Sequence, residues 1–295
     1  MKDHRSLLRC VISIFAVALF LCCDAFAQQD IEIRGSETLI YLGQRVSSLY
    51  QKDPNASPLR VLGGGIPKTL SPNEIAQWEG TSANPQSRGS EHIVFPVGIQ
   101  TVVIYVHRSN AVRALTLSQV RKIFLGEITN WKELGGQDST ILLYAGESST
   151  GTLAYFQDAL LHGDEPYPFV GKSNTKDLLN EIAQRPDSIG YGSLDSNPEV
   201  ATVSIKVGPT SLPVEPTRDN IRSRQYPITR YIYWAVSNKA GSSAVTLCHW
   251  VLSPTGQLVV ESVGFEPLLP SDRSAGLQSL NAATPARVLP AALGR

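Results

Sequence analysis

The sequence predicts an α/β protein with two lobes that are joined by two crossing segments. Short apolar strands alternate with amphipathic helices along the chain, a pattern typical of parallel-type α/β sheets. Two long extended runs, residues 93–107 and 226–234, are interpreted as the segments that cross between the lobes. The chain has 295 residues and is 42% apolar, which is enough for the cores of two modest lobes.

The N-terminus has the features of a secretory signal. Three basic residues precede an apolar run over 10–23, and Ala25-Phe26-Ala27 matches the A-x-A cleavage pattern. A retained membrane anchor is the alternative, but the run is shorter than the roughly 20 residues that a spanning helix needs. Bulky residues before Cys22 and Cys23 disfavour a lipid anchor. We therefore expect cleavage after Ala27 and a soluble chain that is periplasmic or secreted.

Charge and cysteine content exclude other classes of protein. The chain has 26 Lys and Arg against 26 Asp and Glu, and the signal removes three of the former and two of the latter. This near balance argues against nucleic acid as a partner. Three of the four cysteines lie in the signal, so Cys248 remains alone. We expect neither an internal disulfide nor a cysteine-based metal site.

The first lobe is predicted to begin with a strand that leads into a helix. Residues 31–34 form this strand, and the turn Gly35-Ser36-Glu37-Thr38-Leu39 opens onto a helix with apolar residues at three-to-four spacing. A second strand over 59–62 ends in Gly63-Gly64-Gly65, which permits a tight turn or a close backbone approach. Residues 71–78, which begin Ser-Pro-Asn-Glu, predict a short helix.

The second lobe is predicted to follow the first crossing run. Residues 116–124 have the periodicity of an amphipathic helix. A strand over 140–144 leads into the turn Glu147-Ser148-Ser149-Thr150-Gly151-Thr152, which opens onto another helix. Residues 175–184 predict a further helix, and residues 189–192 a strand.

The turn over 147–152 predicts an anion site. Its hydroxyl and amide groups stand where a helix has unpaired N–H groups and a partial positive charge, so a phosphate or carboxylate fits there. The alternative is that Ser148 to Thr150 only cap the helix. The turn over 35–39 also delivers hydroxyl groups to a helix start, and this repetition favours the functional interpretation.

The chain returns to the first lobe through the second crossing run. A helix over 244–252 and the segment 256–269 complete this lobe. Residues 271–295 are rich in Ala, Pro, Leu and Ser without periodicity, and they predict disorder.

These stretches resemble the PstS-type phosphate-binding proteins of ABC importers. The resemblance covers nearly the whole mature chain up to about residue 270, in the expected order. It is carried by GSETL (35–39), GGG (63–65), LTLSQVRKIFLGEITNWKELGG (115–136), ESSTGT (147–152), SIGYG (188–192), YPITRYIYW (226–234) and GQLVVESVGFEPL (256–268). It implies a two-lobed periplasmic binding protein fold of the class II type, in which each lobe is a mixed sheet flanked by helices and the lobes close on an oxyanion.

The resemblance also implies domain limits and binding residues. The implied division is a signal over 1–27, lobe 1 over 28–103 and 229–270, lobe 2 over 104–228, and a disordered tail over 271–295. The implied ligand-binding residues are Ser36, Thr38 and the amide of Leu39 in lobe 1, with Ser149, Thr150, Gly151 and Thr152 in lobe 2.

Two parts of the family's pattern are missing. The family follows its glycine strand with a serine and with an aspartate in a D-I-A-type motif, and neither has a counterpart here. Without a carboxylate to accept the proton of phosphate, phosphate and sulfate are expected to compete within about tenfold of each other. The arginine expected four places before Thr150 is Gly146, and losing such a donor weakens binding about 10- to 150-fold. Lys68 and Arg88 are either substitutes or plain surface charges.

We therefore expect a monomeric extracytoplasmic binding protein that delivers phosphate or a related oxyanion to an ABC permease without a cofactor. The alternative is a degenerate binding-protein domain that has no ligand and acts through protein contacts, as a regulator or envelope scaffold. The histidines lack metal-ligand spacing and no Ser/His/Asp set can be assigned. The sequence accordingly predicts a binding module and not an enzyme such as a phosphatase.

Overall fold

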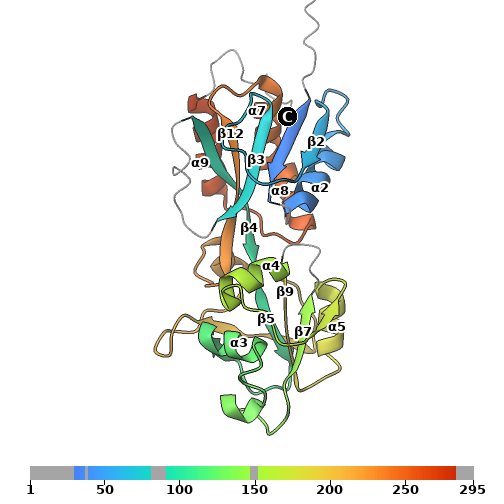
Figure 1. The fold of residues 1–295 in the computed structure, drawn as a ribbon, viewed down its shortest axis with the longest axis vertical. Helices are drawn as coiled ribbons and strands as arrows, with labels where there is room; N and C mark the ends of the chain where they lie inside the picture. Colours follow the sequence, from blue (N-terminus) through green and yellow to red (C-terminus); the bar gives the residue numbers. More distant parts are fainter. Residues whose placement is uncertain (1–29, 37–38, 81–90, 147–151, 284–295) are drawn as a thin grey trace, which may run out of the picture.

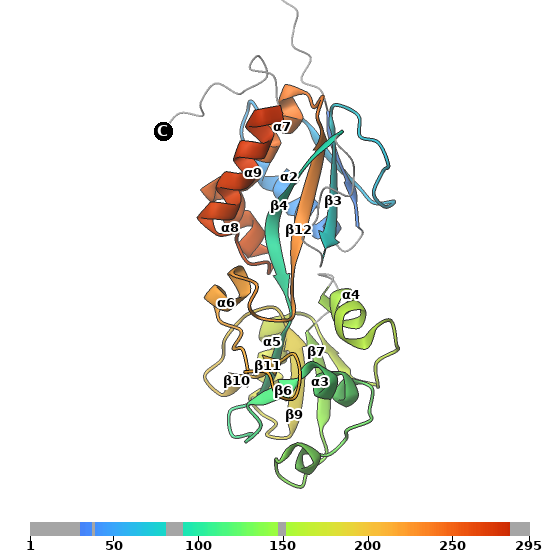
Figure 2. The ribbon, with the colours of Figure 1, turned by 90° about the vertical axis from the view of Figure 1, so that its left-hand side faces the viewer.

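The computed structural model describes residues 30–36, 39–80, 91–146 and 152–283, and these residues form two lobes stacked along the long axis of the molecule (Figure 1). Each lobe is built on a five-stranded sheet that contains both parallel and antiparallel pairs. Helices flank both sheets (Figures 1 and 2). The predicted α/β architecture of two lobes, each with a mixed sheet, is confirmed.

The sheet of the first lobe has the strand order β2-β1-β3-β12-β4. The strand bounds are β1 Ile31–Gly35, β2 Leu59–Leu62, β3 Glu74–Gly80, β4 His92–Thr101 and β12 Thr229–Ser237. Strand β1 pairs in parallel with β2 and β3, whereas β12 runs antiparallel to both of its neighbours. Ile31 and Ile33 are fully buried and alternate with partly exposed residues, so β1 turns one face to the core.

Helices cover the first-lobe sheet. In the described part of the chain they are α2 Ile40–Tyr50, α7 Ser242–Leu252, α8 Pro254–Ser262 and α9 Pro270–Ala283. Helix α2 buries Leu42 and Val46, which lie one turn apart on the same face. Helix α8 begins at a serine cap, because the Ser253 side chain accepts a hydrogen bond from the Gly256 amide and Pro254 occupies the first turn.

The end of the chain corrects one prediction. Residues 271–283 were expected to be disordered, but they belong to helix α9, which lies against β4 and α7. Leu280 is fully buried, and the Tyr231 hydroxyl donates to the Asp272 carboxylate at 2.9 Å. The absence of helical periodicity misled the prediction, because α9 is fixed by these tertiary contacts more than by its own pattern. Residues 284–295 lie outside the described residues.

Strand β3 corrects a second prediction. The helix-start contact expected at residues 71–78 does form locally, since the Ser71 amide donates to the Glu74 carboxylate at 2.8 Å. The chain nevertheless continues as a strand, because β3 pairs with β1 on one side and β12 on the other. Two ladders of backbone hydrogen bonds therefore outweigh the local helix signal.

Two antiparallel segments connect the lobes. Strand β4 is followed after Val102 by β5 Val103–His107 of the second lobe, and β12 pairs with β4 along its length. The amide of Val102 and the hydroxyl of Thr101 both donate to the Ile228 carbonyl, at 3.1 and 3.0 Å. The two long extended runs therefore lie side by side at the junction (Figure 2).

The sheet of the second lobe has the strand order β10-β5-β9-β7-β8. A separate two-stranded sheet pairs β6 with β11, and α6 leads into the second crossing segment. The remaining elements are β6 Ala114–Thr116, α3 Leu117–Phe124, η3 Trp131–Leu134, β7 Leu142–Gly146, α4 Thr152–Phe156, the π-helical turn η5 Gln157–Leu161, β8 Val170–Lys172, α5 Thr175–Ile182, β9 Ser188–Gly192, β10 Val200–Thr202, β11 Ser204–Lys206 and α6 Arg218–Arg222.

The expected signal over 1–27 lies outside the described residues. Among the helices that are described, none has both the length and the apolar character needed to cross a membrane. Cys248 is a free, buried thiol in α7, where it packs with the apolar core.

Candidate functional site

The lobe boundary brings together polar residues that are far apart in the sequence. Ser36 follows β1, and its hydroxyl donates to the carboxylate of Glu79, near the end of β3, at 3.0 Å. Figure 2 shows the end of β3 pointing toward the second lobe, with α4 facing it. Thr152 begins α4 and is buried. Two of the predicted binding residues therefore lie on the facing sides of the two lobes.

The other predicted binding residues are only partly described. Thr38, Ser149, Thr150 and Gly151 lie outside the described residues. Leu39 is fully buried, and its amide donates to the Ser36 carbonyl at 3.1 Å. The Leu39 amide therefore closes the turn after β1 in this arrangement.

Arg230 is the charged group at the centre of this boundary. It lies on the crossing strand β12, and its side chain is only 9% exposed. The guanidinium is 3.7 Å from the Glu79 carboxylate of lobe 1 and 3.6 Å from the Asp158 carboxylate of lobe 2. It also lies over the ring of Tyr155 in α4, 4.0 Å from the ring centroid. One buried cation thus contacts both lobes.

Among the described residues, one hydrogen bond fixes the guanidinium. The Arg230 Nε donates to the Gln100 side-chain oxygen at 2.8 Å. At 3.6 and 3.7 Å the two carboxylates are ion-pair partners and are too distant to accept hydrogen bonds. The Gln100 Nε2 is buried and has no hydrogen-bond partner in the part of the chain that the structure describes. The centre of the boundary therefore holds donor groups that the described residues do not satisfy.

Burial sets the electrostatics of this cluster. It lowers the pKa of Arg230 below its ordinary value, while the nearby carboxylates of Glu79 and Asp158 act in the opposite direction. The guanidinium nonetheless stays protonated at neutral pH. Burial also raises the pKa of the Tyr155 hydroxyl, so that this residue remains a neutral platform beneath the cation. A guanidinium that makes one hydrogen bond with the described residues can bind a small anion through its other N–H groups.

A hollow between the lobes lies at the start of α4, and the residues of the Arg230 cluster do not line it. Its volume is about 460 Å³, and Thr152 is one of its lining residues. Lobe 1 lines it with residues 261–264, and lobe 2 with residues 173–176 and 193–195. The α4 end of the boundary is therefore accessible to a small solute.

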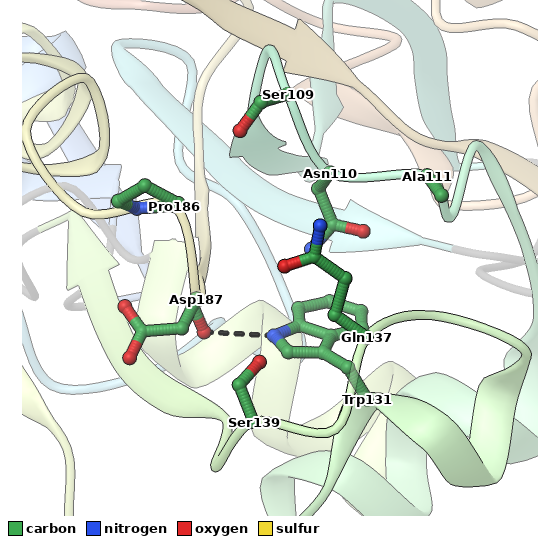
Figure 3. Close-up of a pocket in the computed structure, with 8 residues that line it drawn as sticks. All are labelled: Ser109, Asn110, Ala111, Trp131, Gln137, Ser139, Pro186 and Asp187. Atoms are coloured by element: carbon green, nitrogen blue, oxygen red, sulfur yellow. Dashed lines mark hydrogen bonds between the residues drawn. The ribbon is translucent and has the colours of Figure 1, made fainter.

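A second hollow lies within the second lobe and away from the boundary (Figure 3). Its volume is about 290 Å³, and Asp187 is its one charged lining residue. The Trp131 indole donates to the Asp187 carbonyl at 2.8 Å, and the Asn110 side chain accepts from the Val112 amide. Because its charged lining residue is a carboxylate, this hollow is unsuited to an anion.

Neither Arg230 nor Glu79 was expected as a site residue from the sequence. Arg230 is the one charged residue in the crossing run 226–234, and an arginine in such an apolar strand is a usable signal. Glu79 directly follows residues 71–78, for which a helix was predicted in place of strand β3, so the sequence did not indicate that it faces lobe 2. The proposed substitute Lys68 is exposed, and Arg88 lies outside the described residues.

Known proteins resemble this chain in both sequence and structure. Phosphate-binding protein PstS of Pseudomonas aeruginosa is 28% identical over 202 residues, which cover 62% of this chain and 62% of the relative. Its counterpart in Borreliella burgdorferi is 34% identical over 164 residues, 51% of this chain and 57% of the relative. The chain thus spans somewhat less than two thirds of the length of these relatives.

Solved structures match over more of the chain. A possible phosphate binding protein from Planctomyces limnophilus superposes with a TM-score of 0.75 at 20% identity, covering 86% of this chain and 98% of the other. An ABC-type phosphate transport receptor from Vibrio cholerae gives a TM-score of 0.66 at 20% identity, covering 82% and 100%. These matches confirm the two-lobed periplasmic binding protein fold of the class II type.

The family assignment follows from a sequence model that matches residues 64–255, described as the PBP superfamily domain. The resemblance to PstS-type proteins that the sequence motifs indicated is confirmed by these relatives. The names of these relatives describe phosphate-binding proteins. The chain belongs to the PBP superfamily.

Proposed function

We propose that this protein is an extracytoplasmic receptor that binds phosphate or a related oxyanion between its lobes and delivers it to an ABC permease. The observation that carries the proposal is the buried guanidinium of Arg230, which lies between the lobes and makes one hydrogen bond with the described residues, from Nε to the Gln100 side chain. It supplies the positive charge that Gly146 does not. The PstS relatives and the Vibrio cholerae receptor support phosphate as the ligand and an ABC importer as the destination.

The ligand-free alternative, a domain that acts only through protein contacts, is less well supported. Such a domain has no need of a buried cation at the lobe boundary, where burial carries a desolvation cost. Beside Arg230, the described residues also leave the buried Gln100 Nε2 without an acceptor. Export also fits a receptor, because the predicted signal would deliver the chain to the compartment where a solute is captured.

Titration calorimetry with inorganic phosphate at neutral pH tests the proposal. Arg230→Met keeps much of the side-chain volume and removes the charge, so it should weaken binding about 10- to 150-fold, as expected for a lost charge-assisted bond. Arg230→Lys keeps the charge but loses the planar fork, and should weaken binding less. Circular dichroism must show that both variants are folded. A folded parent protein that binds no phosphate at millimolar concentration would exclude the receptor function.

A further inference from the structure

The guanidinium of Arg230 faces more negative charge than it carries. Glu79 approaches it from lobe 1 and Asp158 from lobe 2, at 3.7 and 3.6 Å. The three ionised side chains together have a net charge of about −1. An entering phosphate brings further negative charge into the same space, where burial weakens solvent screening. A bound anion and both carboxylates are therefore poorly compatible around one cation.

The two carboxylates differ in how firmly they are held. Glu79 is 9% exposed and accepts a hydrogen bond from the Ser36 hydroxyl. Asp158 is 73% exposed, and its carboxylate makes no hydrogen bond with the residues that the structure describes. Moving Asp158 away from Arg230 exposes a carboxylate that water already largely solvates. Moving Glu79 would break a hydrogen bond in a buried site.

We propose that Asp158 is an internal competitor for the anion site: its carboxylate neutralises Arg230 when no ligand is bound, and a bound phosphate displaces it. This inference rests on the proposed function. Asp158 lies in the turn η5, directly after α4, so it belongs to the lobe opposite Glu79. Its side chain can leave the guanidinium by turning toward solvent, without any change in the buried partners Gln100 and Tyr155.

The competition lowers the affinity of the protein for phosphate, and the pairing of Asp158 with Arg230 stabilises the ligand-free site. Without Asp158, Glu79 would be the one carboxylate among the described residues that pairs with Arg230 in the empty site. With Asp158 in place, the cation is paired before the ligand arrives, and part of the ligand's interaction energy is used to replace that pair. Removing the Asp158 charge should therefore strengthen binding, in contrast to removing an ordinary binding residue.

Asp158→Asn tests this inference, with inorganic phosphate as the probe in titration calorimetry at neutral pH. The substitution removes one charge at nearly constant volume, and affinity should rise about tenfold, as expected for a unit charge beside a partly exposed anion site. Asp138→Asn is the matched control. Asp138 is also exposed, at 67%, and is paired with Lys132 at 2.9 Å, so the same change there alters the net charge without touching the boundary. The control should bind as the parent does.

A double variant shows whether the gain passes through the guanidinium. In the Arg230→Met background, Asp158→Asn should give much less than its tenfold gain, because the pair that it relieves is absent. If the parent binds phosphate and Asp158→Asn binds equally or more weakly, the competitor role is overturned and the receptor function stands. If no variant binds phosphate although all are folded, the receptor function fails and the competitor role fails with it.

Discussion

Arg218 of α6 and the buried carboxylate of Glu266 form an ion pair of 3.2 Å beside the crossing strands. Arg222, on the same helix, reaches the same carboxylate at 3.3 Å. The backbone of Glu266 exchanges two hydrogen bonds with Ile99 of β4, at 2.8 and 2.9 Å. Helices α6 and α4 lie on opposite sides of the crossing strands (Figure 2). Ion pairs therefore lie on both sides of the junction: those of Glu266 beside α6, and that of Arg230 with Asp158 next to α4.

The burial of the Glu266 carboxylate predicts a pH dependence of stability. Burial raises the pKa of Glu266 above its ordinary 4.5, although Arg218 and Arg222 act in the opposite direction. The folded state therefore holds this proton more tightly than the unfolded state does. The resulting stabilisation is complete below pH 4.5 and is lost as the pH rises through the raised pKa.

Glu266→Gln should remove this component. Urea unfolding of the parent and the variant between pH 4 and 7 provides the comparison: the free energy of unfolding of the parent should fall more with rising pH than that of the variant. Glu261→Gln is the control, because Glu261 is the more exposed partner of Arg218, at 39% against 6% for the Glu266 side chain. Equal slopes for all three proteins would contradict the assignment to Glu266.

Glu79 changes the expected anion selectivity. The sequence lacks the family's aspartate, but the structure places the Glu79 carboxylate beside Arg230 and within 3.0 Å of the Ser36 hydroxyl. A carboxylate there can accept a hydrogen bond from the hydroxyl group of hydrogen phosphate, and it repels sulfate, which has no hydroxyl group to donate at neutral pH. We therefore expect phosphate to bind more than tenfold more tightly than sulfate, since a hydrogen bond to a charged group contributes about 1.5 to 3 kcal/mol.

Glu79→Gln should bring the phosphate and sulfate affinities closer together, mainly by improving the binding of sulfate. Competition titrations with both anions measure the ratio. Glu74→Gln, at the other end of the same strand and paired with Arg34, should leave the ratio unchanged. If the parent binds phosphate and sulfate with affinities within tenfold of each other, the expectation drawn from the missing aspartate is correct. Glu79 then does not distinguish the protonated anion from the unprotonated one.

Helix α9 is expected to contribute to global stability. Leu280 is fully buried in the main core cluster, and Gly276 lets the helix approach Phe95 of β4 and Leu252 of α7 closely. Leu280→Ala should lower the free energy of unfolding by about 2 to 5 kcal/mol, through lost burial and a residual cavity. Gln278→Ala, on the exposed side of the same helix, should change it by less than about 0.5 kcal/mol. Thermal or urea unfolding of both variants gives the comparison.

The sequence predicted correctly those helices and strands whose local conformational preference agrees with the conformation that tertiary contacts favour. Helix α3 was expected to start at Thr116, and this residue caps it by a reciprocal pair of hydrogen bonds with Gln119. Strand β3 and helix α9 were missed because their conformations depend on partners elsewhere in the chain: β1 and β12 for the strand, β4 and α7 for the helix. The propensity of a short segment carries no information about such partners.

The site was predictable only in part, for the same physical reason. The Ser36 and Thr152 turns have a recognisable composition, because hydroxyl groups before a helix act locally. The cluster of Arg230, Glu79 and Asp158 instead depends on the pairing of β12 with β3 and on the position of α4 across the boundary. Their charges alone are indistinguishable from surface charges in the sequence.

The domain arrangement provides the last prediction. If residues 104–228 form a lobe inserted between the two parts of the other lobe, proteases should spare the crossing segments, which are paired along β4 and β12 and share the Ile228 carbonyl. Limited proteolysis of the full chain, with fragments identified by mass spectrometry, should leave residues 92–107 and 226–237 uncut. Because α9 packs on the core, trimming at the C-terminus should stop after residue 283 and not at 270. A cut within 92–107 that released a free N-terminal domain would contradict the inserted arrangement, since that product requires a first lobe that is complete without β12.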